Sequence, residues 1–328
     1  MATLRGARAV RALRAGARAA STAASVPGIT RVGVLGLGLM GSGIAQTAAA
    51  AGFEVVGVDT PAGAERGLGM IRASLAAAAA RAAKKEGAAA GAAAEAAGAA
   101  TLGRVRTAAS VRDVAACDLV IEAVPETMAA KTPLYEELGR CLQPSAIIAT
   151  NTSGLPVRSL ASLAGARWLS RGIGLHYFNP VQVMALVEVV TLDETDAAVT
   201  ASAHAFVRAV GKTPVACKDT PGFVVNRLLV PYMAQAFKLV GEGVASFKDV
   251  DVAMKLGAGH PMGPFTLADY VGLDTTLSIL ENWSAMYPGE PAFFVPALLR
   301  EKVAAGDLGR KSGRGFYKWK GNTPLLDE

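Results

Sequence analysis

A glycine-rich loop between an apolar run and a helical stretch constrains the fold of this chain more than any other feature of its sequence. Arg31–Leu35 is typical of a short buried strand, and the residues from the loop to Ala51 are typical of a helix. In Gly-x-Gly-x-x-Gly the first glycine permits a tight turn, the second lets the backbone approach a pyrophosphate, and the third lets helix and strand pack closely. The loop consists of Gly36, Leu37, Gly38, Leu39, Met40 and Gly41.

An acidic residue follows the second apolar run, where a dinucleotide-binding unit needs one. Glu54–Val58 is expected to be a strand that ends at Asp59, 21 residues after Gly38. A carboxylate there accepts a hydrogen bond from a ribose 2′-hydroxyl and repels a 2′-phosphate. Thr60 and Pro61 come next, with no arginine beside the acid. The pattern predicts NAD binding and favours NAD over NADP; the alternative is a glycine-rich turn that binds no ligand.

Apolar runs alternate with helical stretches up to about residue 217. This alternation predicts an α/β fold, with a doubly wound, mostly parallel Rossmann-type sheet over residues 30–218. The last apolar runs follow each other closely, which indicates an antiparallel edge. We expect a smaller all-α domain over residues 219–328 and assign no structure to the alanine- and glycine-rich residues 87–100. The expected helices of the second domain are Phe223–Val240, Val250–Leu256, Leu273–Met286 and Phe294–Ala304.

An imidazole and a carboxylate stand in an otherwise apolar stretch. His176 precedes the turn-forming pair Asn179-Pro180, and Glu188 lies within the next apolar run. If the two runs are antiparallel strands and the two residues are opposite each other, their Cβ atoms lie about 5 Å apart. A histidine oriented by a carboxylate is the usual general base near neutral pH. A structural His–Glu pair in the core explains the same pattern, so this segment alone leaves both roles open.

Polar residues follow two further expected strands. Glu126 and Lys131 come after the apolar run 118–124, and Asn151 and Ser153 come after the next run. In an open parallel sheet the carboxyl ends of the strands line the ligand crevice. These side chains are therefore candidates for contacts with a nicotinamide ribose or a substrate oxygen. Helix capping by Asn151 or Ser153 is the alternative.

Composition excludes several functions. The net charge of +6 arises almost wholly from arginines in the first 29 residues, and a nearly neutral remainder gives no reason to expect nucleic-acid binding. This leading segment is rich in arginine, contains serine and threonine and lacks acids, which is typical of a mitochondrial transit peptide; a disordered basic arm is the alternative. No apolar run is long enough to span a membrane. Three separated cysteines and three histidines predict neither a disulfide framework nor a metal site. The arginines are Arg5, Arg8, Arg11, Arg14 and Arg18.

Taken together, these features resemble the short-chain L-3-hydroxyacyl-CoA dehydrogenases of mitochondrial fatty-acid β-oxidation. The most distinctive stretch is Asp219–Arg227, which reads Asp-Thr-Pro-Gly-Phe-Val-Val-Asn-Arg. The resemblance runs through nearly all of residues 31–320 and is weakest over 76–100. The matching segments are Gly36–Gln46, Asn151–Ser153, Gly174–Pro180 with Glu188, Lys218–Tyr232, Gly257–Phe265 and Gly309–Lys318.

The resemblance implies an enzyme of the mitochondrial matrix that oxidises (S)-3-hydroxyacyl-CoA to 3-oxoacyl-CoA with NAD, the third step of β-oxidation. It implies that His176 is the general base and that Glu188 orients its ring. Ser153 and Asn226 would contact the 3-oxygen and the acyl-thioester region of the substrate. Cofactor contacts are implied for Asp59, Glu126, Lys131, Ser153 and Lys311.

The resemblance also implies where coenzyme A and a second subunit bind. Ser74 and Arg81 fall where the family contacts coenzyme A, although the family commonly has lysine at the second position. A homodimer through the C-terminal domain is implied as well.

Other kinds of protein share parts of this pattern. β-Hydroxyacid dehydrogenases share the Gly-Leu-Gly-x-Met-Gly loop, but they use a catalytic lysine in a Gly-Lys-type helix motif that we do not find after residue 165. An L-gulonate 3-dehydrogenase or its lambda-crystallin relative shares much of the pattern. A non-enzymatic NAD-binding structural protein would need neither the His–Glu pair nor Ser153 and Asn226.

Overall fold

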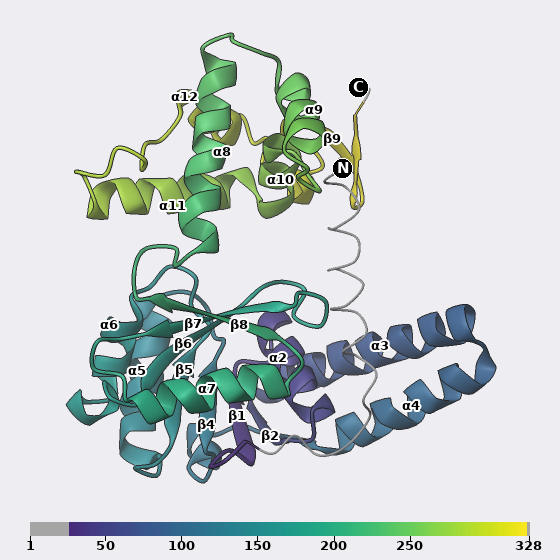
Figure 1. Ribbon diagram of the computed structural model, residues 1–328, viewed down its shortest axis with the longest axis vertical. Coiled ribbons are helices and arrows are strands. Elements are labelled where there is room, and N and C mark those ends of the chain that lie inside the picture. The colour runs from purple at the N-terminus through teal and green to yellow at the C-terminus, as the bar shows by residue number, and fades with distance from the viewer. Residues whose placement is uncertain (1–25, 327–328) are drawn as a thin grey trace, which may run out of the picture. The chain divides into compact units, whose positions relative to one another are not determined.

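The computed structural model describes residues 26–326, which divide between Thr220 and Pro221 into two compact units (Figure 1). The side chains of Val26 and Ile29 are buried in the core of the first unit. Most of the predicted transit segment, residues 1–25, lies outside the described part of the chain. Removal of everything up to residue 29 would take these two core side chains with it, and the transit segment itself stays a prediction.

The first unit contains an eight-stranded sheet in the order β3-β2-β1-β4-β5-β6-β7-β8. All neighbours are parallel except β6 and β7, which confirms the predicted mostly parallel sheet with an antiparallel pair. The short β3, whose side chains are half-buried or exposed, was not predicted. The strands are β1 (Arg31–Leu35), β2 (Glu54–Val58), β3 (Val105–Ala108), β4 (Leu119–Glu122), β5 (Ile147–Thr150), β6 (Gly172–Tyr177), β7 (Leu186–Thr191) and β8 (Thr213–Lys218).

The strand order determines where a ligand crevice is expected. The chain builds the sheet outward from β1 in one direction and then from β4 in the other, so the order reverses between these two central strands. In the register of the β1–β4 pair, Leu35 lies opposite Glu122 at the carboxyl ends. Ligands of open parallel sheets bind at such a switch point, outside the carboxyl ends of the strands.

Helices cover the sheet and form one projecting hairpin. Figure 1 shows α3 and α4 running side by side away from the sheet. The alanine- and glycine-rich residues left unassigned are thus mostly helical, because alanine is the strongest helix former. Gly91 permits the close approach of α4, since a Cβ there would lie 2.6 Å from the Ala83 Cβ. The helices are α2 (Leu39–Ala50), α3 (Pro61–Glu86), α4 (Ala88–Gly103), α5 (Met128–Cys141), α6 (Val157–Leu163) and α7 (Ala197–Ala209).

The second unit is mainly helical, as predicted, and adds a two-stranded hairpin that was not predicted. Its core contains clustered aromatic rings, among them Phe237, Phe265 and Phe316. The buried carboxylate of Asp269 accepts hydrogen bonds from the Tyr317 amide and from the indole of Trp319 (2.9 and 3.0 Å), which fixes the hairpin to the helices. Its elements are α8 (Val225–Gly241), α9 (Phe247–Gly257), α10 (Pro264–Val271), α11 (Leu273–Met286), α12 (Ala297–Ala304), β9 (Lys318–Lys320) and β10 (Thr323–Leu325).

Over residues 26–326, no helix combines the length and the apolar character that crossing a bilayer requires.

Candidate active site

The glycine loop between β1 and α2 has the geometry that a pyrophosphate needs. Gly36 adopts a φ of 85°, and a Cβ on it would lie 2.8 Å from the Ala123 carbonyl oxygen. A Cβ on Gly41 would lie 1.7 Å from the Gly36 oxygen, so only glycine lets the helix start so close to the strand. A Cβ on Gly38 would meet nothing within 4 Å. The second glycine therefore leaves open space beside the amino end of α2, where the helix dipole favours an anion.

Asp59 joins the loop to the end of β2. Its Oδ2 accepts a hydrogen bond from the Leu37 amide (2.7 Å), and its Oδ1 accepts one from the Thr60 amide (2.7 Å). A carboxylate has about four acceptor sites, so a ribose hydroxyl can still bind it. Asp59 thus holds the glycine loop in shape, and its contact with a ribose stays a prediction.

His176 and Glu188 form a buried pair on neighbouring strands. The register of β6 and β7 places the two residues directly opposite each other, which confirms the predicted cross-strand pairing. His176 Nδ1 lies 2.6 Å from Glu188 Oε2, and the two residues are 4% and 0% exposed. A neutral imidazole that donates its Nδ1–H to the carboxylate carries its basic lone pair on Nε2. The arrangement can therefore take up a proton at Nε2 and stabilise the resulting imidazolium.

The loop after β5 is tied to the strand that carries His176. Asn151 Oδ1 accepts a hydrogen bond from the Tyr177 amide at 2.9 Å. Glu126 Oε1 accepts the amides of Ser153 and Gly154 (2.9 and 3.0 Å). Burial alone would raise the pKa of Glu126, but the nearby ammonium of Lys131 and hydrogen bonds from Thr152 and Gly154 outweigh it and hold the pKa below its usual value. The ionised Glu126 thus fixes the backbone of Ser153.

A buried ion-pair network lies beneath this loop. The ammonium of Lys131 lies 3.0 Å from Glu122 Oε2 and 2.7 Å from Glu126 Oε2. Glu122 also accepts the hydroxyl of Thr150 at 2.9 Å and the amide of Val124 at 2.8 Å. A fully buried carboxylate is tolerated because it is paired and fully hydrogen-bonded. Sequence reasoning missed Glu122, and the one available signal was an acid within the apolar run Leu-Val-Ile-Glu.

A pocket of about 170 Å³ brings several of these groups together at the switch point. It contains four of the residues predicted to contact the cofactor, from the glycine loop and from the ends of β4 and β5. Its lining residues are Met40, Glu122, Ala123, Val124, Glu126, Lys131, Asn151 and Ser153. The donors, acceptors and open glycine backbone fit a nicotinamide dinucleotide.

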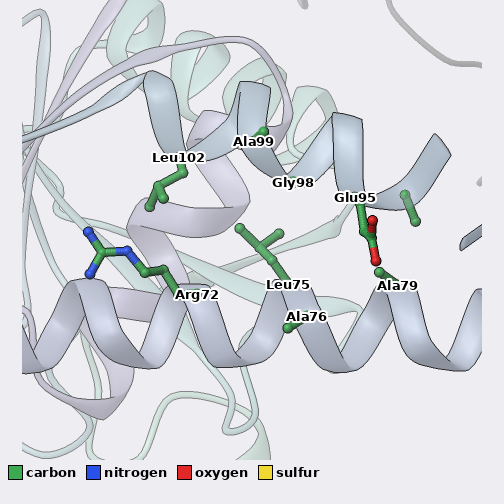
Figure 2. Close-up of a pocket in the computed structure, with 9 residues that line it drawn as sticks. Arg72, Leu75, Ala76, Ala79, Glu95, Gly98, Ala99 and Leu102 are labelled. Carbon is green, nitrogen blue, oxygen red and sulfur yellow. The ribbon is translucent and has the colours of Figure 1, made fainter. Parts of the chain in front are cut away.

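The predicted coenzyme A residues lie apart from this pocket, on α3. Ser74 and the exposed Arg81 are seven residues apart on that helix, so they lie on nearly the same face. Between α3 and α4 lies a separate, mostly apolar pocket of about 190 Å³, which neither residue lines (Figure 2). Arg72 and Leu75 enter it from α3, and Leu102 enters it from α4. Alanine side chains are too small to fill the space between the two helices.

Two predicted site residues belong to the second unit. Asn226 is half-buried in the first turn of α8. Its neighbour Arg227 lies 2.7 Å from Glu290. The ammonium of Lys311 lies 2.5 Å from the carboxylate of Asp274. Roles in binding for Asn226 and Lys311 stay predictions.

No group of three or more metal-binding side chains occurs within residues 26–326.

The sheet order, the glycine loop and the acid after β2 define the first unit as the dinucleotide-binding domain of a dehydrogenase. Residues 31–220 match the family model of the 3-hydroxyacyl-CoA dehydrogenase NAD-binding domain, and residues 222–319 match that of the C-terminal domain. The chain therefore belongs to the 3-hydroxyacyl-CoA dehydrogenase family, and NAD is its cofactor, as predicted.

Individual relatives agree with this assignment. A probable 3-hydroxyacyl-CoA dehydrogenase of Caenorhabditis elegans is 47% identical over 93% of this chain and 98% of its own length. The mitochondrial hydroxyacyl-coenzyme A dehydrogenase of Sus scrofa is 43% identical over 95% of this chain and 98% of its own. The crystal structure of an (S)-3-hydroxybutyryl-CoA dehydrogenase from Ralstonia eutropha is 41% identical, covers 89% of this chain and 99% of that one, and superposes with a TM-score of 0.82.

Proposed function

We propose that this protein oxidises (S)-3-hydroxyacyl-CoA to 3-oxoacyl-CoA with NAD, and that His176 is the general base. The observation that carries the proposal is the buried contact of 2.6 Å between His176 Nδ1 and Glu188 Oε2. His176 lies on β6, and a hydrogen bond from Tyr177 of this strand to Asn151 ties it to the loop that contains Ser153. Asn151 and Ser153 line the pocket at the switch point. A structural ion pair alone would not need to sit beside a cofactor pocket.

Each site residue has a separate role in the proposed reaction. His176 takes the proton of the 3-hydroxyl at Nε2, while Glu188 fixes the ring tautomer and stabilises the imidazolium. NAD, which the glycine loop and Asp59 would hold, would supply the acceptor for the hydride of the substrate's C3. Ser153 and Asn226 hydrogen-bond the 3-oxygen and the thioester region. Return of the proton to solvent from His176 completes the cycle.

Cofactor binding is assigned to the glycine loop and the charged residues around it. Asp59 would accept hydrogen bonds from the ribose hydroxyls, and Glu126, Lys131 and Ser153 would contact the nicotinamide ribose. For Lys311, a contact with the cofactor is supported by the family resemblance alone. The support is the open space at Gly38 and the convergence of Glu126, Lys131 and Ser153 on one pocket.

Coenzyme A binding is assigned to the exposed face of α3. The hydroxyl of Ser74 and the guanidinium of Arg81 would hold the phosphates, since a guanidinium binds phosphate through two parallel hydrogen bonds. An Arg81→Ala variant is expected to raise the KM for the acyl-CoA while the KM for NAD stays constant. An unchanged KM for the acyl-CoA would remove α3 from the binding site.

The activity is tested by following NADH formation with residues 26–328 of the chain. We expect reduction of NAD with (S)-3-hydroxybutyryl-CoA and hardly any reduction of NADP. A series of acyl chain lengths then gives the substrate preference. No NADH with any 3-hydroxyacyl-CoA, together with turnover of L-gulonate, would replace the proposal with the gulonate dehydrogenase alternative.

We further propose the mitochondrial matrix as the location. The arginine-rich, acid-free leading segment supports this, as does the mitochondrial relative from Sus scrofa, which is similar over 95% of the chain. A fusion of residues 1–25 to a fluorescent protein is expected to enter mitochondria. A cytosolic fusion would contradict the assignment.

A homodimer through the second unit is the last part of the proposal. Val252 and Leu256 lie one turn apart on α9 and are 48% and 82% exposed, although both are large and apolar. A second copy of this chain would remove such a face from water. Light scattering is expected to give the mass of a dimer, and Leu256→Lys is expected to shift it toward the monomer. A wild-type monomer at micromolar concentration would contradict this part.

A further inference from the structure

The loop between β6 and β7 connects the two residues of the proposed catalytic pair. It runs from Phe178 to Ala185, directly after the strand of His176 and directly before the strand of Glu188. Side chains at its tip are exposed, with Val183 at 73% and Met184 at 39%. Its backbone is nevertheless held from two sides, and any movement of the loop moves the ends of both strands.

Lys212 holds the loop from one side. It lies in the turn between α7 and β8 and is only 8% exposed. Its ammonium donates hydrogen bonds to the carbonyl oxygens of Val181 (2.5 Å) and Met184 (2.6 Å). The next residue, Thr213, donates its amide to the Ala185 carbonyl at 2.7 Å. Three consecutive contacts thus attach the loop to the start of β8.

The burial of this lysine is costly in a way that an exposed lysine would not be. Both acceptors are neutral carbonyl oxygens, and burial lowers the pKa of the Lys212 ammonium. A buried charge costs free energy unless it is paired or hydrogen-bonded, so these two hydrogen bonds compensate the burial of Lys212. Lys218, the last residue of β8, offers a contrast, because its side chain is 65% exposed and pairs with the exposed Asp193.

The helix that follows the glycine loop holds the loop from the other side. Val181 is 1% exposed and packs against α2 at Gly43, where a Cβ would lie 2.7 Å from the Val181 Cβ. Gln182 donates its side-chain amide to Gln46 Oε1 on the same helix at 3.1 Å. The loop thereby bridges the cofactor helix and the two strands of the His–Glu pair.

We propose that Lys212 is a positioning residue for the reaction: its two hydrogen bonds hold the β6–β7 loop, so that His176 and Glu188 keep their mutual geometry and their place relative to the cofactor helix. This inference rests on the proposed role of His176 as the general base. Lys212 itself touches neither member of the pair in any contact described above, so it acts through the loop backbone.

The test compares Lys212→Met, Lys212→Arg and the matched control Lys218→Met in the full chain. Lys212→Met keeps an unbranched side chain but removes the donors, and we expect kcat to fall on the order of 10- to 10²-fold, since a shift of about 1 Å costs that much. The dissociation constant of NADH, from fluorescence, should change by less than about threefold, within the usual effect of a distant change. Lys212→Arg should restore most of kcat, and Lys218→Met should match the wild type.

Two readouts separate positioning from a merely structural role. To obtain kcat, the maximal rate is divided by the concentration of NADH-binding sites. A loss of folded protein is then not mistaken for a loss of turnover. The ¹⁵N spectrum of the histidine rings reports the Nδ1–H···Glu188 bond directly, with His176→Gln used for assignment. We expect its His176 signal to shift in Lys212→Met and not in Lys218→Met. Should Lys212→Met fail to fold, Lys212→Gln, whose shorter side chain keeps an NH2 group, replaces it with a smaller expected loss.

The inference would be overturned if the wild type is active and Lys212→Met leaves both kcat and the His176 signal unchanged. An inactive wild type would instead refute the proposed function, and in that case the His176 signal still tests whether Lys212 holds the pair.

Discussion

Replacing Glu188 by glutamine tests how much of the proposed chemistry depends on its charge. Glu188→Gln keeps the side-chain size but removes a negative charge whose oxygen lies 2.6 Å from His176 Nδ1, in a fully buried position. When the ring takes a proton, the two charge centres lie roughly 4 Å apart, and at an effective dielectric constant of about 20 their attraction is about 4 kcal/mol. Each ~1.4 kcal/mol of barrier corresponds to a tenfold rate change, so we expect kcat to fall on the order of 10³-fold.

The assay is steady-state NADH formation from (S)-3-hydroxybutyryl-CoA, with NADH binding measured by fluorescence as a check on folding. The matched control is Glu194→Gln, which removes a carboxylate from an exposed pair with Arg158 and should leave kcat unchanged. A fall of less than about tenfold in Glu188→Gln, with NADH binding intact, would refute the electrostatic reasoning.

Three further predictions concern stability and reactivity. Gly98→Ala is expected to stabilise the protein by about 0.5–1 kcal/mol, because the new Cβ would make an ordinary contact at 3.4 Å. Gly91→Ala should destabilise it, because the new Cβ would lie 2.6 Å from the Ala83 Cβ. Denaturant unfolding measures both free-energy changes. Because the pKa of Glu126 is lowered in the folded protein, its ionised form stabilises the fold at pH values above its ordinary pKa of about 4.3. This contribution is lost as pH falls through the folded-state pKa. The difference in free energy of unfolding between the wild type and Glu126→Gln should therefore shrink as pH falls. Burial raises the pKa of Cys117 to about 11, so alkylation at pH ~8 should need unfolding.

Local signals in the sequence were enough to predict most of the first unit. The glycine loop, the acid at Asp59 and the turn at Asn179-Pro180 each depend on a few adjacent residues, and the structure has the expected strand or turn at each. The pairing of His176 with Glu188 was predicted from two apolar runs joined by one reversal of the chain, and the β6–β7 register has it. Helix α4 was not predicted, because its near-uniform alanine content shows no periodicity from which a packed face could be read.

The supporting contacts of the site could not be predicted, because they join residues far apart in the sequence. The hydrogen bond from the Leu37 amide to Asp59 and the bond from the Tyr177 amide to Asn151 are examples. Lys212 reads as an ordinary turn lysine until the fold places carbonyl oxygens around its ammonium. Sequence motifs thus indicate which groups react or bind, and tertiary contacts determine how firmly those groups are held.

The central claim is that His176 is the general base of an NAD-dependent 3-hydroxyacyl-CoA oxidation. Its most direct test is kcat of His176→Gln with (S)-3-hydroxybutyryl-CoA, measured beside the dissociation constant of NADH. We expect kcat to fall by roughly 10²–10⁴-fold, as the loss of a general base should cause, while NADH binding stays similar. Unchanged turnover would contradict the claim and return the His176–Glu188 pair to a structural role.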